Sequence, residues 1–260
     1  MSFKSPTVAI DQGIILKSPA EIGLMRAAGK ILAEIIAVLK SEIHAGMTTA
    51  ELDAVAAREL AAHKVTPSFL GYRGYPAHIC VSVNNEIVHG IPGPRVMKEG
   101  DIIGIDAGLI REGWQADSAV TVGIGKISPE AARLIETTKL SLDAGIAAAR
   151  GGARIGDISA AVQRVAEAAG FGIIREYVGH GIGRAMHEEP PIANFGTAGR
   201  GPLLRPGMAL AIEPMLTTGD WHTRVGSDGW TVYTKDGSLA AHFEHSIAIH
   251  EGEAEVLTAL

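Results

Sequence analysis

The sequence has few of the residues that disulfide frameworks, membrane spans and nucleic-acid surfaces require. Cys80 is its only cysteine, so no disulfide can form within the chain, and a lone thiol fits a reducing compartment. No apolar run approaches the ~18 residues of a membrane helix, and the formal net charge of −6 includes no stripe of Lys and Arg. The first residues lack the apolar stretch of a secretory signal. We therefore expect a soluble cytoplasmic protein that binds neither membranes nor nucleic acid directly.

Glycine, in contrast, is abundant, with 32 residues in a chain of 260, which indicates many tight turns. A chain of this length forms one large domain or two of about 130 residues, and it can bury roughly three quarters of its unfolded surface. No low-complexity stretch or Pro/Ser-rich linker divides it. We expect a short segment, 1–17, followed by one fused domain, 18–260.

Two segments begin alike, with a serine suited to cap a helix and a proline suited to its first turn. Ser18-Pro19 and Ser128-Pro129 are these pairs. The serine oxygen can accept an otherwise unpaired backbone N–H, and proline lies where no N–H is needed. Glu21 completes a capping box in the first segment. The side chains expected to face the core then recur at helical spacing: Ile22, Met25, Ile31, Ile35 and Leu39 in the first, and Leu134, Thr138, Leu142, Ile146 and Ala149 in the second.

Further matches extend this similarity into an internal repeat at a nearly constant offset. Residues 46–52 and 152–158 each begin a second helix after a glycine, and residues 96–106 and 203–213 each contain a turn, an apolar strand and a final carboxylate. A period this long excludes a solenoid. The repeat predicts an α+β fold in which two halves are related by an approximate twofold axis. Helices would cover one face of a strongly curved, mostly antiparallel sheet, with a site between the halves. The halves span about 18–126 and 127–250.

Two acids of the first half lie in apolar, strand-like surroundings. Asp106 ends an apolar run, and Asp117 lies in the next strand, after a turn at 111–113. A hairpin symmetric about residues 111 and 112 would place these acids opposite each other, with Cβ atoms about 5 Å apart, where like charges repel. Both acids could instead be solvated turn or cap residues, and Gln115 and Ser118 could supply ordinary hydrogen bonds to Asp117. If both are buried, they need protonation or a cation.

The second half repeats this arrangement with Glu213 and Glu244, each next to an apolar strand. Four acids in such surroundings, two from each half, favour a shared counter-charge. Two divalent cations would neutralise four carboxylates, whereas one would leave about two negative charges uncompensated. The sequence therefore predicts a dinuclear metal site with oxygen ligands and an imidazole.

Three histidines are candidates for that imidazole or for roles beside it. His180 and His187 lie in the glycine-rich stretch 179–190, whose spacing is wrong for an HExxH zinc helix, and His89 lies on a turn of the first half. His242 would share a strand face with Glu244, so it either supports the ligands from behind or lies on an unrelated surface. For the remaining histidines we expect surface or capping positions: His44, His63, His78, His222, His245 and His250.

The order Asp106, Asp117, His180, Glu213, Glu244 resembles the dinuclear metal set of the methionine aminopeptidases, which have the pita-bread fold. The resemblance is closest to their type I, bacterial-style class. It rests on the stretches 71–76, 85–92, 100–106, 179–183, 187–190, 212–214 and 243–245.

The resemblance implies a role for each candidate ligand. Asp106 would chelate one metal, Asp117 and Glu244 would bridge two, and His180 and Glu213 would complete the second. The ions would be Co²⁺, Mn²⁺, Fe²⁺ or Zn²⁺. Glu213 would also act as general base and acid.

The resemblance also implies residues that contact the substrate. His187 would donate a hydrogen bond to the substrate carbonyl or scissile amide, and His89 would contact the amide nitrogen. The family's pocket for the methionine side chain corresponds to Tyr72, Tyr75, Cys80 and Trp230, although Tyr75 and Trp230 could equally be ordinary core aromatics. Three neighbours depart from the family's usual residues, with Phe69 in place of Cys, Met186 in place of Phe and Arg73 in place of His.

The resemblance implies metal-dependent removal of the N-terminal methionine from nascent proteins, with a preference for a small second residue. A proline-specific dipeptidase or aminopeptidase P would use the same five ligands but normally has a large N-terminal domain. A non-catalytic binding relative normally lacks some of the ligands, and a metal phosphoesterase would not need an aromatic pocket. We expect a monomer whose partners are N-terminal peptides, with the ribosome as a further candidate partner.

Overall fold

The computed structural model describes residues 8–10 and 13–260, and each half of this chain begins with a pair of helices after its N-cap serine. Strands β1 (Val8–Ile10) and β2 (Ile14–Leu16) precede the first half. The first half contains α1 (Pro19–Glu42), α2 (Thr49–Ala62), β3 (Thr66–Pro67), the 3₁₀ helix η2 (Tyr72–Gly74), β4 (Ile79–Val83), β5 (Glu86–Val88), β6 (Ile102–Arg111) and β7 (Trp114–Gly123). The second half contains α3 (Pro129–Ala148), α4 (Ile155–Ala168), β8 (Gly172–Ile173), β9 (Gly179–Gly181), β10 (Glu188–Ile192), β11 (Ala209–Ile212), β12 (Met215–Thr217), β13 (Thr223–Val225), β14 (Val232–Thr234), β15 (Ala240–His242), β16 (Glu244–Ala248) and β17 (Glu255–Val256). None of the described helices has both the length and the apolar character needed to cross a bilayer.

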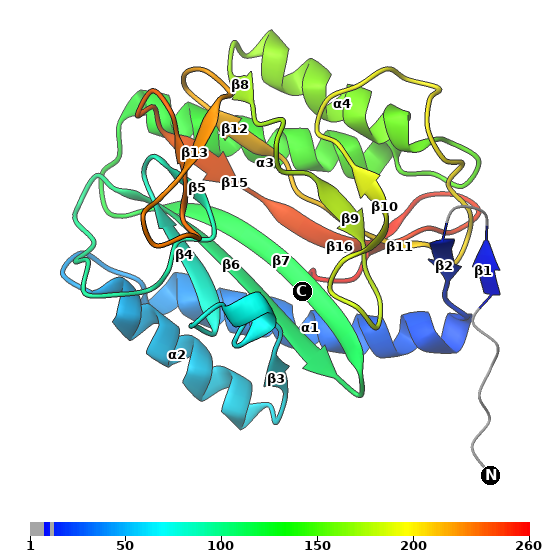
Figure 1. Ribbon diagram of the computed structural model, residues 1–260, viewed down its shortest axis with the longest axis horizontal. Coiled ribbons are helices and arrows are strands. Elements are labelled where there is room, and N and C mark those ends of the chain that lie inside the picture. Colours follow the sequence, from blue (N-terminus) through cyan, green and yellow to red (C-terminus); the bar gives the residue numbers. More distant parts are fainter. Residues whose placement is uncertain (1–7, 11–12) are drawn as a thin grey trace.

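The main sheet is antiparallel at each of its described pairings and joins the two halves at its centre. Its strands follow the order β10-β9-β11-β16-β7-β6-β3, with β4 beside β6 and β17 beside β16. The pair β7–β16 therefore connects the halves, and α1 with α2 and α3 with α4 flank the sheet (Figure 1). Two isolated bridges, Thr48 with Val96 and Arg154 with Leu203, occupy equivalent places in the two halves. The architecture confirms the predicted α+β pita-bread fold.

Helix α1 and helix α3 begin where the sequence indicates. The hydroxyl of Ser18 accepts the N–H of Glu21, whose carboxylate in turn accepts the N–H of Ser18, so the capping box is complete. The hydroxyl of Ser128 accepts the N–H of Ala131 in the same way. Pro19 occupies the first turn of α1, where its missing N–H costs nothing.

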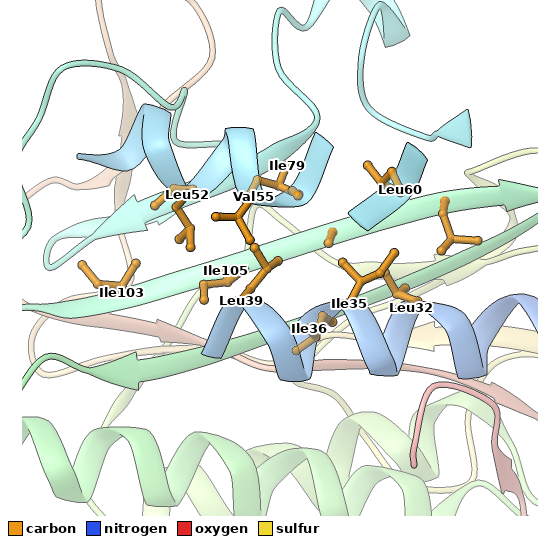
Figure 2. Packing of buried hydrophobic residues seen from close by; sticks show 14 of the residues in the cluster. Leu32, Ile35, Ile36, Leu39, Leu52, Val55, Leu60, Ile79, Ile103 and Ile105 are labelled. Carbon is orange, nitrogen blue, oxygen red and sulfur yellow. The ribbon is translucent and has the colours of Figure 1, made fainter. Parts of the chain in front are cut away.

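The apolar core lies between the helices and one face of the sheet. In the first half, α1 and α2 pack Leu32, Ile35 and Leu52 onto β4 and β6 (Figure 2). In the second half, a separate cluster joins α3 and α4 to β11 and β16. Val120 of β7 packs against both clusters, so both helix pairs cover the same face of the sheet. The opposite face remains available for polar side chains.

The register of the β6–β7 hairpin differs from the predicted one. Asp106 pairs with Ala119, and Asp117 pairs with Gly108, so the two acids are diagonal neighbours on one face instead of directly opposite. The turn is centred one residue later than expected, on Glu112 and Gly113, which have φ angles of 52° and 78°. A two-residue hairpin turn with positive φ at both positions matches the right-handed twist of the strands, which favours this register.

Replacing a core leucine of α1 should destabilise the protein far more than replacing an exposed leucine. We expect Leu32→Ala to lower the free energy of unfolding by about 2–5 kcal/mol, because it removes buried methyl groups and leaves a cavity. Leu32 is fully buried, whereas Leu140 of α3 is 50% exposed, so Leu140→Ala is the matched control. Urea unfolding in the presence of the same metal would measure both, and equal midpoints would contradict this account of the core.

Candidate metal centre and substrate cavity

One cavity of about 160 Å³ brings together the residues that the sequence analysis singled out, although they are far apart in the chain. Its walls include all five candidate ligands: Asp106, Asp117, His180, Glu213 and Glu244. They also include the two histidines proposed to contact the substrate and every residue of the expected side-chain pocket: His89, His187, Phe69, Tyr72, Tyr75, Cys80, Met186 and Trp230. Arg73 lines the cavity as well.

The candidate ligands converge because neighbouring strands present them on one face of the sheet. The adjacent strands β6, β7, β16 and β11 each contain or directly precede one carboxylate: Asp106, Asp117, Glu244 and Glu213. Glu244 pairs with Ala119, and His180 pairs with Ala211, so the alternation of side chains places all five on the same face. This face is opposite to the one that the helices cover.

The four carboxyl groups strongly oppose one another's ionisation. Burial raises the pKa of Asp106 to about 7. Burial also raises the pKa of Asp117, Glu213 and Glu244 well above the usual range, and repulsion from their acidic neighbours adds to each shift. No Lys or Arg among residues 13–260 forms an ion pair with any of the four. The described protein thus supplies no permanent positive charge to this group.

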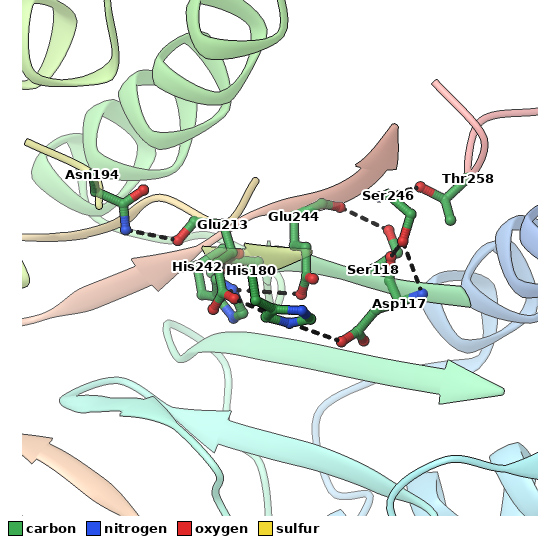
Figure 3. A network of polar contacts seen from close by, with 10 residues as sticks. Asp117, Ser118, His180, Asn194, Glu213, His242, Glu244, Ser246 and Thr258 are labelled. Carbon is green, nitrogen blue, oxygen red and sulfur yellow. Dashed lines mark hydrogen bonds and ion pairs between the residues drawn. The ribbon is translucent and has the colours of Figure 1, made fainter. Parts of the chain in front are cut away.

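His180 is held with one ring nitrogen directed at the acids. Its Nδ1 donates to the carbonyl of Gly181 at 2.8 Å, because a carbonyl can only accept, and this bond leaves the lone pair on Nε2. Nε2 lies 3.6 Å from a Glu213 oxygen and 3.9 Å from an Asp117 oxygen (Figure 3). Burial, with repulsion from His187, lowers the pKa of the imidazole to about 4. A neutral ring with a free lone pair is the form that binds a metal.

The donor atoms fit divalent cations. Ligand atoms of Asp117, His180 and Glu244 lie within 4.8 Å of one another, and so do those of Glu213, His242 and Glu244. One carboxylate oxygen each of Asp106, Asp117 and Glu244 is buried without a hydrogen-bond partner in the described structure. Buried polar atoms normally have partners, so atoms left free around a common point favour an ion there.

His242 lies beside the acids, which is one of the two positions considered from the sequence, whereas the partly buried His245 corrects the expected surface or capping position. His242 is 3% exposed, and its Nε2 lies 3.8 Å from one oxygen of Glu213 and one of Glu244. His245 lies on the helix-covered face, where its Nδ1 bonds the hydroxyl of Thr258 at 2.8 Å and burial lowers its pKa to about 4. The alternation of side chains along the strand, which puts His242 on the same face as Glu244, is the only sequence feature that points to His242. No sequence feature points to Thr258 as the partner of His245.

His89 and His187 border the cavity from different elements. His89 follows β5 with a φ angle of 60° and packs edge-on against the rings of Tyr177 and Trp230. His187 precedes β10, and its Nδ1 lies 2.9 Å from the hydroxyl of Tyr72. Burial lowers the pKa of His89 to about 4, and it also lowers that of His187. No feature of the sequence points to Tyr177, because only the fold brings it to His89.

The side-chain pocket has an aromatic wall centred on Tyr75. This residue is 3% exposed, its hydroxyl donates to the carbonyl of Gly90 at 2.9 Å, and its ring packs edge-on against Phe69 and Trp230. Cys80 lies beside it, and burial raises the pKa of its thiol well above the usual value. Such walls suit a thioether, which gains from contacts with ring edges.

Comparisons with known proteins agree with this geometry. Residues 23–251 match the model of metallopeptidase family M24. The chain is 49% identical over 245 residues to a methionine aminopeptidase of Clostridium perfringens, covering 94% of this chain and 98% of the relative. The crystal structure of a methionine aminopeptidase from Thermotoga maritima superposes with a TM-score of 0.93 at 44% identity, over 95% of this chain and all of that one.

A prolidase from Pyrococcus furiosus has the same fold at 20% identity and a TM-score of 0.78. The match covers 96% of this chain but 66% of the prolidase, so it reflects the shared architecture alone. The extent of the family match, the identity to relatives of nearly equal length and the group of Asp, His and Glu side chains lead to one conclusion. The chain is a hydrolase that belongs to metallopeptidase family M24 and, within it, to the methionine aminopeptidases.

Proposed function

We propose that this protein removes the N-terminal methionine from nascent polypeptides in a metal-dependent reaction and prefers a small second residue. The observation that carries the proposal is the meeting of four buried carboxylates with a neutral imidazole, directly beside an aromatic pocket. The carboxylates and the imidazole suit metal-assisted hydrolysis, and the aromatic pocket suits a methionine side chain. Membership of the methionine aminopeptidases supports the same substrate.

We assign the metal ligands as Asp106, Asp117, His180, Glu213 and Glu244. Asp106 would hold one divalent ion, Asp117 and Glu244 would bridge two, and His180 with Glu213 would complete the second. Charge balance supports two ions, drawn from Co²⁺, Mn²⁺, Fe²⁺ or Zn²⁺. When bound, such ions supply Lewis acidity and lower the pKa of water.

The catalytic roles fall to three residues around the ligands. Glu213 would accept a proton from the attacking water and pass it to the leaving amine. His187 would donate to the substrate carbonyl from Nε2 while the hydroxyl of Tyr72 donates to its Nδ1. His89 would contact the scissile amide nitrogen. Both histidines have lowered pKa values, so each is neutral near pH 7.

We also propose a location, an oligomeric state and a class of substrate for the protein. We place the protein in the cytoplasm as a monomer that forms one fused catalytic domain over 18–260. Its substrates would be the N-terminal peptides of newly made proteins, met at the ribosome or after release. The excess of acidic over basic residues gives no support to direct binding of nucleic acid.

Metal removal and replacement should control activity on methionine peptides. We expect EDTA treatment to abolish cleavage of Met-Gly peptides and Mn²⁺ or Co²⁺ to restore it, because the buried carboxylates need a cation to act together. Met-Leu peptides should be cleaved more slowly than Met-Gly peptides, and Ala-Gly peptides least. Product release would be followed by chromatography. Preferential cleavage of Xaa-Pro peptides would instead favour a proline-specific enzyme.

Stability of the metal-free protein should fall as pH rises from about 5 to about 8. The raised pKa values of Asp106, Asp117 and Glu244 mean that the folded state retains protons that the unfolded chain has already released, so folding becomes less favourable as these protons leave. Bound Mn²⁺ would offset the negative charge that these protons neutralise in the metal-free protein. The difference in Tm between Mn²⁺-loaded and EDTA-treated protein should therefore widen with pH.

Thermal unfolding at several pH values would measure this difference. Glu244→Gln should flatten the profile of the metal-free protein, because it removes one of the groups whose pKa is raised. Asp143→Asn, at an exposed acid of α3, is the control and should leave the profile unchanged. A metal-free protein that becomes more stable over this pH range would contradict the electrostatic account.

A methyl group at Gly108 should narrow the side-chain pocket. A Cβ there would lie 3.0 Å from a ring carbon of Phe69 and 3.2 Å from the terminal methyl of Met186, both of which line the cavity. We expect Gly108→Ala to lower kcat/KM for Met-Gly peptides by about 10-fold, and to affect a norvaline peptide, whose side chain is shorter, less.

Gly104→Ala provides a matched control on the same strand and the same face. Its Cβ would meet no atom closer than 3.5 Å, which is ordinary contact. Steady-state kinetics of both variants with the two peptides would test the prediction. An equal loss for both peptides, or an equal effect of both substitutions, would show that Gly108 does not shape the pocket.

A further inference from the structure

A buried ion pair lies outside the candidate metal centre and has no part in the chemistry proposed above. The ammonium of Lys17 donates to one oxygen of Glu188 at 2.7 Å, and the two side chains are only 1% and 6% exposed. Burial lowers the pKa of Lys17, and its hydrogen bond to the Glu188 carboxylate opposes that shift. A buried pair is costly to desolvate, and removing one partner leaves the other as an uncompensated buried charge.

The second oxygen of Glu188 holds the loop that precedes it. This oxygen accepts the backbone N–H of Arg184 at 3.0 Å and that of Ala185 at 3.3 Å. Gly183 lets the loop backbone approach this oxygen closely, because a Cβ at this position would lie 2.5 Å from the oxygen and 2.7 Å from the side chain of Lys17. The loop 183–187 therefore wraps around the carboxylate, which is the acceptor for two of its N–H groups.

Lys17 is itself tied to the frame of the molecule. Its ammonium also donates to the carbonyl of Ile15 at 3.2 Å, and its backbone N–H donates to the carbonyl of Gly207 at 2.7 Å. It lies between β2 and Ser18, the N-cap of α1, and β2 contacts β10 (Figure 1). The loop that Glu188 holds is thus connected, through Lys17, to α1 and to the turn before β11.

The same loop presents two side chains to the cavity. Met186 is 4% exposed and forms part of the pocket wall, and His187 faces Tyr72 and His180, with a distance of 4.3 Å between the two imidazole centres. Among the described residues, neither Met186 nor His187 donates its own backbone N–H to a backbone carbonyl. Their backbone is therefore held through its neighbours, Arg184 and Ala185 before it and Glu188 of β10 after it.

We propose that Lys17 and Glu188 are positioning residues, whose buried ion pair fixes the loop 183–187 and thereby sets the place of His187 and Met186 in the cavity. The part concerning His187 rests on the proposed function, because it assumes that this histidine contacts the substrate. The ion pair suits the task better than an apolar contact would. A carboxylate accepts two N–H groups with definite geometry, and the lysine holds that carboxylate in place.

The test compares Lys17→Met, Glu188→Gln and the double variant in the Mn²⁺-loaded enzyme. Lys17→Met leaves a buried carboxylate without its cation, so the loop should shift. We expect kcat on a Met-Gly peptide to fall by about 10-fold or more, because a catalytic group displaced by roughly 1 Å can cost about 10²-fold. KM and bound metal should change less than about 3-fold, since the ligands lie elsewhere.

The double variant should recover part of the lost kcat. The amide introduced by Glu188→Gln has no charge to pair, and its oxygen can still accept the two backbone N–H groups. Lys139→Met, which removes the exposed pair with Asp143, is the control and should leave kcat unchanged. A loss in Lys17→Met that appears equally in metal content, or no greater loss than in the control, would overturn the proposal. So would a double variant no better than Lys17→Met.

Amide hydrogen exchange provides a test in the wild-type protein that needs neither a variant nor activity. Arg184 and Ala185 are exposed, so protection of their N–H groups should come from the carboxylate of Glu188. We expect both amides to exchange slowly, and free exchange at both would overturn the proposal. If the enzyme failed to cleave methionine peptides while these amides stayed protected, the proposed function would fail and the anchoring of the loop would stand.

Discussion

Repulsion among four buried carboxylates is the constraint on which the rest of this structure depends. Asp106, Asp117, Glu213 and Glu244 come from four neighbouring strands and share one face of the sheet. Burial and proximity both oppose their ionisation, and the described residues supply no lysine or arginine to offset it. The core clusters on the opposite face supply the stability that holds these groups together, and the divalent cations proposed for this site would supply the charge that makes them compatible.

Polar contacts behind the acids keep the central strands in register where the two halves meet. The hydroxyl of Ser246 accepts the N–H of Asp117 at 3.1 Å and donates to its carbonyl at 2.8 Å. The hydroxyl of Ser118 donates to the carbonyl of Glu244 at 2.8 Å (Figure 3). These side-chain bonds complete a short ladder between β7 and β16, so the two carboxylates from different halves keep a defined separation. The geometry of a site between the two halves therefore depends more on contacts that join the halves than on the structure of either half alone.

Local features of the fold follow from short stretches of sequence. Ser18 and Ser128 cap helices because their hydroxyls reach N–H groups three residues along, and this depends on neighbours only. The predicted hairpin places the turn one residue too early in the chain, because the sequence does not show which two of residues 111–113 adopt positive φ. The correct pair, Glu112 and Gly113, moves Asp106 and Asp117 from opposite to diagonal positions.

The sequence by itself determined the repeat, the helix starts and the presence of acids in apolar strands, because each depends on residues close together in the chain. Only the tertiary structure decided which side chains meet. His242 approaches Glu213 and Glu244, and Lys17 reaches Glu188 across 171 positions, because strand order and the packing of the two halves bring them together. Periodicity in the sequence shows which face of a helix or strand is apolar, whereas contact between distant elements depends on how the whole chain folds.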